Sequence, residues 1–433
     1  MPAPRRRPRA PRPPGTPARR PGAAGPPAPG HRRDRRRPTA LLRPAGAALV
    51  LAATLALAAG CGGSSAASSD GGGQDAVPVS GGEPGAVADE LPEGAVTVMA
   101  RELDTPWEVR FLPGGDLLVT ERRGRLLRLA RDAGGQGAPY GIVETHAIEG
   151  VREVGEGGLM GLALHPDFPS TPRIYLCHTL EAGGELRNRV VRFRYAGGEL
   201  DEREVLLGGV PGAAIHDGCR LEFGPEGHLF VTSGDAGEKD DARDRGSLAG
   251  KIHRIGPDGA VPGDNPFGSP VWSLGHRNPQ GLAFDGRGRL WSAEHGPSGF
   301  SSGRDEINLI RRGGDYGWPE ITGGEPRDGM IAPRLHSGSS TWAPAGLAHR
   351  EGRLYFGGLR GAALYEARGL AGGEEPEVRL LAHFRDEFGR IRPVRVGPEG
   401  RIWFGTSNRD GRGSPADSDD RLIAVEPDAL SGG

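Results

Sequence analysis

The feature of this sequence that most constrains its fold is an internal repeat. Each copy has an alternating apolar segment, a Gly- or Pro-rich turn and a second alternating segment, which is the pattern of a half-buried β-hairpin. Copies occur at residues 109–120, 162–179, 221–232, 282–291, 347–356 and 394–403. Their spacing of roughly 50 to 65 residues leaves room for four strands per repeat. Because such a repeat cannot cover both faces of its own sheet, we expect an all-β, six-bladed β-propeller.

A pair of β-sandwiches with coincidental Pro-Gly turns is the alternative fold, and six copies at similar spacing argue against it. The 75 glycines and 39 prolines among 433 residues also favour many short strands over long helices. In a propeller the loops of all blades meet at one end of the channel. We therefore expect functional residues to be scattered through the sequence, just outside the strands.

The N-terminal region differs from the rest in composition. Residues 1–38 contain clustered Arg and Pro without apolar periodicity, and an apolar run at 47–59 precedes Cys61 and a Gly/Ser-rich stretch. We predict a leader with a lipoprotein signal at 1–60, a flexible linker at 61–92 and the propeller at 93–430. A transmembrane anchor is the alternative, but the run is shorter than the roughly 20 residues that span a bilayer. The predicted protein is exported, and is either lipid-anchored through Cys61 to the outer face of the cell membrane or secreted.

Removal of the leader reverses the balance of charge. Residues 1–60 contain 13 basic residues and one acidic residue, so the remainder holds 41 basic and 55 acidic side chains. A strongly acidic surface disfavours nucleic acid as a partner. The remainder also contains Cys177 and Cys219, which could form a disulfide or be small buried hydrophobic residues. We favour two free thiols.

Polar phrases lie at the edges of the repeats. They occupy residues 155–161, 215–221, 275–281, 294–297, 305–310 and 313–319. Residues 246–251 are one residue too short for a phosphate-binding loop, and the sequence has no His-Glu-x-x-His motif. Nucleotide cofactors and zinc are therefore not supported.

These phrases, in this order, resemble the soluble quinoprotein glucose/sorbosone dehydrogenase family, which includes bacterial aldose sugar dehydrogenases that use pyrroloquinoline quinone. The resemblance covers residues 103–425, nearly the whole predicted propeller. It implies oxidation of an aldose sugar at C1 to its lactone, with hydride transfer to the quinone. The electron acceptor that reoxidises the quinone is not indicated.

The resemblance also assigns roles to residues near the predicted channel mouth. His216 matches the catalytic base. Removal of a proton from a sugar hydroxyl requires a base that titrates near the working pH, and a histidine meets this requirement. Arg277 and Asn278 match contacts to the quinone, with Arg277 beside the carbonyl that gains negative charge. Asp235 matches a position near the substrate.

Three further arginines match the residues that bind the carboxylates of the quinone, Arg360, Arg390 and Arg392. Two positions depart from the family pattern. Glu156 stands where some relatives have Gln, and a carboxylate beside an anionic cofactor is unfavourable unless it is protonated, paired with calcium or turned away. Pro393 stands where Asp is common, and we expect it to alter strand pairing.

The resemblance also implies two calcium (Ca²⁺) sites, for which oxygen ligands are typical. The main-chain carbonyls of Gly296 and Pro297 match ligands of a cofactor-linked calcium. Asp305, Glu306 and the Tyr316 carbonyl match a second, structural site, although Asp305 and Glu306 could also be a solvated loop pair.

Two other function classes compete with the dehydrogenase. A non-catalytic six-bladed propeller could bind a ligand or carbohydrate, and a calcium-dependent lactonase would use the propeller and the metal. Neither requires a matched base and arginine set, so the residues favour the dehydrogenase.

Overall fold

The computed structural model describes residues 79–80, 85–86, 94–298, 303–369 and 379–431. Strands dominate this part of the chain, and its helical segments are the short 3-10 helices η1 (Lys239–Ala242) and η3 (Pro427–Ser431). None of its helices is long and apolar enough to cross a membrane. The all-β prediction is confirmed. The leader predicted at 1–60, together with Cys61, lies outside the described residues, and the range 61–92 contains the short strands β1 (Val79–Ser80) and β2 (Gly85–Ala86).

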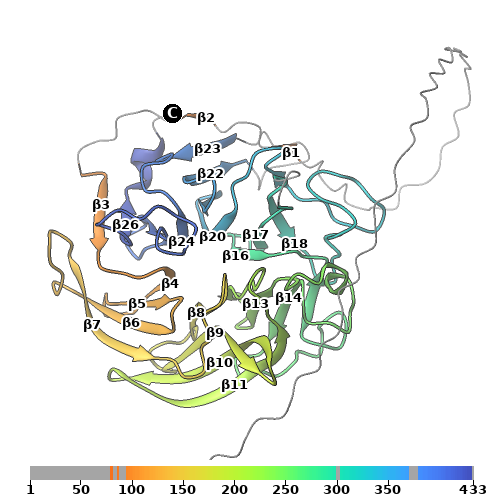
Figure 1. Cartoon of the computed structure of the whole chain (residues 1–433), viewed down its shortest axis with the longest axis horizontal. Coiled ribbons are helices and arrows are strands. Elements are labelled where there is room, and N and C mark those ends of the chain that lie inside the picture. The colour runs from red at the N-terminus through yellow and green to blue at the C-terminus, as the bar shows by residue number, and fades with distance from the viewer. Residues whose placement is uncertain (1–78, 81–84, 87–93, 299–302, 370–378, 432–433) are drawn as a thin grey trace, which may run out of the picture. The chain divides into compact units, whose positions relative to one another are not determined.

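The strands form five hydrogen-bonded sheets, mostly antiparallel (Figure 1). The eight-stranded sheet contains β4 (Pro106–Phe111), β5 (Leu117–Glu121), β6 (Arg125–Arg131), β7 (Tyr140–Ala147), β24 (Ile391–Val396), β25 (Ile402–Thr406), β26 (Leu422–Val425) and β3 (Val96–Ala100). Two four-stranded sheets contain β8 (Leu159–Leu164), β9 (Arg173–Ala182), β10 (Glu185–Ala196) and β11 (Glu199–Pro211), and β12 (Leu221–Phe223), β13 (Leu229–Ser233), β14 (Lys251–Ile255) and β15 (Val271–Leu274). Two five-stranded sheets contain β16 (Pro279–Phe284), β17 (Leu290–Glu294), β18 (Glu306–Ile310), β19 (Leu335–His336) and β1, and β20 (Pro344–Arg350), β21 (Arg353–Gly358), β22 (Leu364–Arg368), β23 (Arg379–His383) and β2.

All six hairpins predicted from the repeat are antiparallel strand pairs. They are β4–β5, β8–β9, β12–β13, β16–β17, β20–β21 and β24–β25. In five of them the turn ends on a glycine with positive φ, the left-handed conformation that glycine adopts without strain. These glycines are Gly115, Gly227, Gly288, Gly352 and Gly400.

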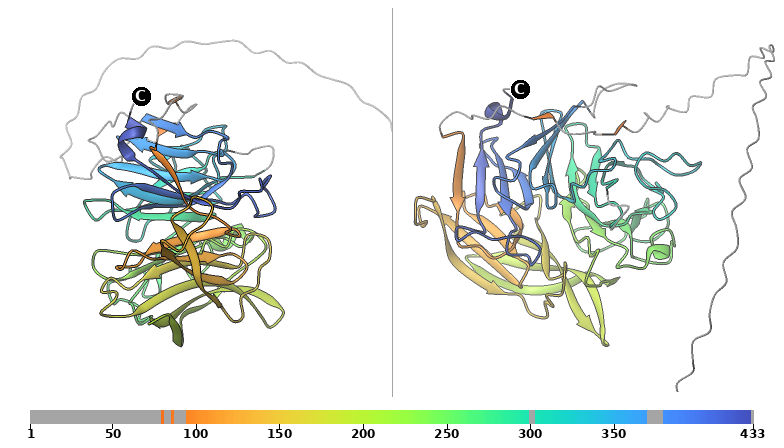
Figure 2. Two further views of the ribbon diagram at one scale, coloured as in Figure 1. Left: turned by 90° about the vertical axis from the view of Figure 1, so that its left-hand side faces the viewer. Right: turned by 45° about the horizontal axis from the view of Figure 1, so that its top comes forward.

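The first strands of the hairpins are arranged in a ring. Strand β4 contacts β8, and the contacts continue through β12, β16, β20 and β24 back to β4. In Figure 1 these strands lie nearest the middle, and Figure 2 shows the sheets from two other directions. Among the described residues, each pair of neighbouring sheets shares a buried apolar cluster, such as the one that contains Trp291 and Phe356. The sheets are therefore held together by packing between their faces.

The eight-stranded sheet joins the two ends of the described fold. Strand β3, near the start, pairs antiparallel with β26, near the end. A single parallel pair, Ala100 with Tyr140, then links these strands to β4–β7. Strand β3 thus continues the run of strands β24–β26 near the end of the chain.

Strand pairing is irregular at Pro393, as it is in most of the other hairpins. The register of β24 with β25 shifts between Ile391 and Val394. The first strands β4, β8, β16 and β20 show a shift in their own hairpins. Pro393 therefore occupies an irregularity that most of the first strands have.

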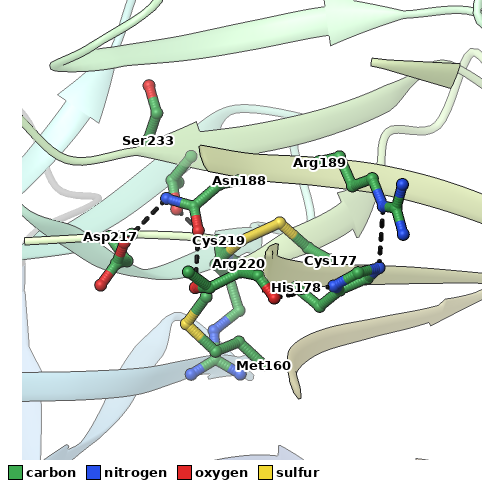
Figure 3. Close-up of a disulfide and its surroundings, with 12 residues drawn as sticks. Met160, Cys177, His178, Asn188, Arg189, Asp217, Cys219, Arg220 and Ser233 are labelled. Atoms are coloured by element: carbon green, nitrogen blue, oxygen red, sulfur yellow. Dashed lines mark hydrogen bonds between the residues drawn. A yellow bond between two sulfur atoms is a disulfide. The ribbon is translucent and has the colours of Figure 1, made fainter. Parts of the chain in front are cut away.

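The prediction of two free thiols is wrong. Cys177 in β9 and Cys219 just before β12 form a disulfide, with their Cα atoms 5.6 Å apart (Figure 3). Both residues are buried in the cluster between these two sheets. The packing of one sheet on the next brings together cysteines that are 42 residues apart in the sequence, a proximity that the sequence alone does not reveal.

Candidate active site

His216 lies in the loop between β11 and β12, three residues before the disulfide cysteine Cys219. Its Nδ1 is 2.6 Å from Oδ1 of Asp235, the second residue after β13. The side chain of His216 is 12% exposed, so part of it is accessible to solvent. Its Nε2 has no hydrogen-bond partner among the described residues. One ring nitrogen is thus held while the other is available.

Asp235 fixes the orientation of that imidazole. Its side chain is buried, and it also accepts hydrogen bonds from the Gly237 N–H (2.8 Å) and the Trp318 Nε1–H (2.8 Å). Burial acts to raise the pKa of Asp235, but the hydrogen bonds from His216, Gly237 and Trp318 lower it below its usual value. An ionised Asp235 accepts a hydrogen bond from the Nδ1–H of His216, which leaves the lone pair on Nε2. The family resemblance predicted that Asp235 lies near the substrate, but it did not predict the hydrogen bond between Asp235 and His216.

Glu156 lies in the loop before β8 and connects three parts of the site. Its Oε2 accepts hydrogen bonds from the His216 N–H (3.0 Å) and from Nδ2 of Asn278 (3.3 Å). Its Oε1 accepts one from Nη1 of Arg412 (2.7 Å). Burial acts to raise the pKa of Glu156, whereas the charge of Arg412 and the hydrogen bonds from Arg412 and the His216 N–H lower it below its usual value. Glu156 is therefore ionised at neutral pH and paired within the protein.

Arg277 and Asn278 lie just before β16. The backbone N–H of Arg277 donates to Glu294, and its Nη2 lies 3.0 Å from Oγ of Ser298. Its guanidinium also lies over the Trp318 ring, 5.4 Å from the ring centre. Asn278 is fully buried and accepts a hydrogen bond from the Gly218 N–H (3.2 Å). The site therefore contains an arginine held on three sides next to the His216 loop.

His295 follows β17 and contributes a second imidazole. Its Nδ1 is 3.5 Å from Nδ2 of Asn278, and its Nε2 is buried without a hydrogen-bond partner in the described part of the chain. Burial lowers the pKa of His295 to about 3, so the ring is neutral at pH 7. A buried ring nitrogen without a partner is costly unless a bound group satisfies it.

Arg390 and Arg392 share one carboxylate. Both Nε and Nη2 of Arg390 donate to Oδ2 of Asp410 (2.9 and 2.8 Å), and Nη2 of Arg392 lies 3.6 Å from the same oxygen. Arg392 is buried, and burial lowers its pKa to about 9. Arg360 follows β21 and is exposed, and its guanidinium has no partner among the residues described. Asp410 accordingly orders two of the three predicted arginines.

The predicted calcium ligands fall into two groups. The carbonyls of Gly296 and Pro297 accept no hydrogen bond from any described residue, so both oxygens are available. The carboxylate of Asp305 is instead occupied by the backbone N–H groups of Gly296 (2.8 Å), Trp342 (2.6 Å) and Ala343 (2.9 Å). Asp305 is therefore better suited to fixing the Gly296 segment than to binding a metal ion.

Glu306 and Tyr316 also have protein partners. Glu306 accepts hydrogen bonds from the Gly323 N–H (2.8 Å) and Nδ2 of Asn308 (3.1 Å), and burial and the neighbouring Glu294 raise its pKa to about 8. The ring of Tyr316 stacks on His276, with ring centres 4.7 Å apart, but the predicted ligand is the main-chain carbonyl, which this contact does not involve. Within the described residues, no three His, Cys, Asp or Glu side chains are grouped to hold a metal ion. The calcium sites stay predictions.

Comparison with known proteins identifies the family. The family model described as Glucose / Sorbosone dehydrogenase matches residues 103–415. The chain belongs to this dehydrogenase family. The resemblance predicted from the motifs is confirmed.

Several members of the glucose/sorbosone dehydrogenase family can be compared directly. The structure of the PQQ-bound aldose sugar dehydrogenase of Streptomyces coelicolor is 36% identical, with a TM-score of 0.69, and the match covers 78% of this chain and 99% of that chain. Aldose sugar dehydrogenase YliI of Escherichia coli is 29% identical over 351 residues, 73% of this chain and 91% of the relative. Quinoprotein glucose dehydrogenase B of Acinetobacter calcoaceticus is 33% identical over 259 residues, 52% of each chain.

Five residues of this glucose/sorbosone dehydrogenase site were not predicted from the sequence. They are His295, Trp318, Asp410, Arg412 and Arg122, whose Nη2 donates to the Asp410 carbonyl (3.1 Å). His295 and Trp318 lie within the phrases 294–297 and 313–319, whose pattern could have drawn attention to them. Asp410 and Arg412 lie in a loop without any motif. Only its fold shows that this loop reaches Glu156.

Proposed function

We propose that this protein oxidises an aldose sugar at C1 to the lactone, with pyrroloquinoline quinone as hydride acceptor and His216 as general base. The observation that carries the proposal is the His216–Asp235 pair, whose free Nε2 lies in a site that also contains Arg277. A protein that only binds a ligand has no need of an imidazole held by a buried carboxylate. The relatives whose names specify aldose sugar or glucose dehydrogenases support the same substrate class.

The residues present fit this cofactor. Its three carboxylates call for cationic partners, which Arg360, Arg390 and Arg392 would supply. Arg277 and Asn278 would hold the quinone ring, and the unpartnered Nε2 of His295 offers a further hydrogen bond. When bound, the quinone would accept the hydride from the sugar and, with it, two electrons.

The side chains of this chain handle the proton and the charge. Nε2 of His216 removes the proton of the sugar hydroxyl, and the ionised Asp235 stabilises the imidazolium that results. The guanidinium of Arg277 would stabilise the negative charge that develops on the quinone carbonyl as the sugar is oxidised. Because the guanidinium of Arg277 already donates to the His295 carbonyl (3.4 Å) and to Oγ of Ser298 (3.0 Å), this stabilisation needs little rearrangement.

We further propose a calcium ion bound by the main-chain carbonyls of Gly296 and Pro297. Neither carbonyl accepts a hydrogen bond from a described residue, which supports this site, and the Asp305 carboxylate would hold the segment in place. The second calcium, at Asp305, Glu306 and Tyr316, has less support because the Asp305 carboxylate is fully engaged.

We also infer six four-stranded blades, with the eight-stranded sheet counted as two. The single pair that links β3 to β7 and the cyclic contacts of the first strands support this count. Lipid attachment at Cys61 and export are part of the proposal too. They are supported by the apolar run at 47–59 and the small residues before the cysteine.

Reconstitution tests the proposed function. The purified protein is titrated with pyrroloquinoline quinone in the presence of Ca²⁺, and reduction of an artificial electron-accepting dye is followed with a panel of aldoses. We expect quinone binding and sugar-dependent dye reduction. Quinone binding without turnover of any sugar would favour a non-catalytic propeller that binds a ligand.

A further inference from the structure

Glu156 places a negative charge inside a site that is otherwise rich in arginine. Its side chain is 11% exposed, and its Oε2 contacts both the His216 backbone and the Asn278 side chain. In the proposed function, His216 removes the proton of the sugar hydroxyl and Asn278 contacts the quinone. A carboxylate fixed here repels a bound tricarboxylate unless its charge is cancelled.

Protonation does not cancel this charge. The contacts with Arg412 and the His216 N–H hold the pKa of Glu156 below its usual value, so the carboxylate stays ionised throughout the neutral range. The hydrogen bonds from Asn278 and from the His216 N–H come from neutral groups. Among its described hydrogen-bond partners, the only permanently charged one is Arg412.

Arg412 is well placed for this task. It lies in the loop between β25 and β26, and its backbone N–H donates to Oδ1 of Asp410 (2.9 Å). Asp410 in turn holds Arg390, so the loop is anchored to the arginine cluster. The guanidinium is 53% exposed, and Glu156 is its partner among the described residues. Exposed ion pairs are usually weak, but here one member is buried in the site.

We propose that Arg412 is a charge-compensating residue of the quinone site, which neutralises Glu156 so that the anionic cofactor can bind beside it. This proposal rests on the proposed function. Arg412 acts through Glu156 and is therefore a positioning residue. Glu156, in turn, keeps its hydrogen bonds to the His216 loop and to Asn278 without repelling the cofactor.

A double-mutant cycle tests the proposal. The affinity for pyrroloquinoline quinone is measured by titration for the wild type, Arg412→Gln, Glu156→Gln and the double variant, with the melting temperature of each cofactor-free protein. We expect Arg412→Gln to weaken quinone binding by about tenfold or more, since it leaves a charge unpaired in the site. Glu156→Gln should leave the affinity unchanged or increase it. The double variant should match Glu156→Gln within about twofold, which is the scatter of independent substitutions.

Arg409→Gln provides the matched control. Arg409 is an exposed arginine of the same loop whose Nε donates to the Asp419 carbonyl (2.8 Å), so this change removes the same charge without freeing Glu156. Its effect on affinity should be much smaller than that of Arg412→Gln. If Arg412→Gln weakens binding equally with Glu or Gln at position 156, the compensation is refuted. If the wild type itself fails to bind the quinone, the proposed function falls and this proposal with it.

Discussion

At the scale of single residues, the proposed chemistry depends on the free Nε2 of His216. We predict that His216→Ala lowers turnover by about 100-fold or more, because a positioned base contributes roughly 10² to 10⁴. Quinone affinity should change by no more than a few fold, since Arg277 and the arginine cluster remain. Steady-state kinetics and quinone titration of the same protein separate the two effects. An equal loss of cofactor binding would make His216 a cofactor contact rather than a base.

The arginines allow a second prediction at this scale. Arg390→Ala should weaken quinone binding by about 1.5 to 3 kcal/mol, the range for hydrogen bonds to charged groups. Arg368→Ala is the comparison, because Arg368 also pairs with a buried carboxylate, Glu366, but lies on β22, the third strand of its sheet counted from the ring. Its titration curve should match that of the wild type. Unchanged binding in Arg390→Ala would remove Arg390 from the cofactor site.

At the scale of elements, the disulfide ties the loop that carries His216 to β9. We predict that Cys177→Ala/Cys219→Ala lowers the free energy of unfolding by about 2 to 4 kcal/mol. Turnover should fall more than quinone affinity, because Cys219 is three residues from the base. Chemical denaturation and kinetics at a temperature well below the unfolding transition measure both.

Val190→Ala is the matched control for the disulfide. Val190 is buried opposite Cys177 in the pairing of β9 with β10, so its truncation weakens the same cluster but leaves the disulfide intact. It should destabilise the protein while turnover stays near the wild-type value. Equal kinetic losses in both variants would show that the disulfide stabilises the fold without positioning His216.

Elements also show what could be predicted from the sequence. Each hairpin was found because its alternation and its turn are local, and the packing of neighbouring sheets does not change either. The disulfide and the His216–Asp235 pair join segments that are distant along the chain, so their contacts depend on how sheets and loops pack. The loop with Asp410 and Arg412 has neither apolar periodicity nor a motif. Its role depends wholly on its position in the ring.

At the scale of the whole molecule, buried neutral histidines make the fold sensitive to acid. Burial lowers the pKa of His178 to about 4 and those of His253 and His295 to about 3, from the ordinary value of 6.5. In the unfolded chain these rings bind protons below about pH 6.5, whereas in the folded protein they stay neutral to much lower pH. The contribution of these histidines to stability is therefore complete above pH 6.5 and is lost as the pH drops, by about 1.4 kcal/mol per pH unit for each proton. The raised pKa of Glu306 acts in the opposite direction, so the histidine contribution is isolated by comparing variants.

Melting temperatures between pH 7.5 and 5 test this dependence. We expect a smaller decline for His253→Asn than for the wild type, whatever the change in stability at pH 7.5. His228→Asn is the control, because the side chain of His228 is 27% exposed. A decline as steep in His253→Asn as in the wild type would show that other groups cause the acid sensitivity.

The pairing of β3 with β26 has a consequence for folding during synthesis on the ribosome. Strand β3 is synthesised first among the strands of its sheet, yet its antiparallel partner is the last strand to be made. During translation its unpaired edge must wait while more than 300 residues are added. Contacts of such high sequence separation slow folding and leave strand edges open to wrong partners. A polypeptide that terminates early would keep that edge uncovered, and cellular quality control could recognise it by this exposed strand.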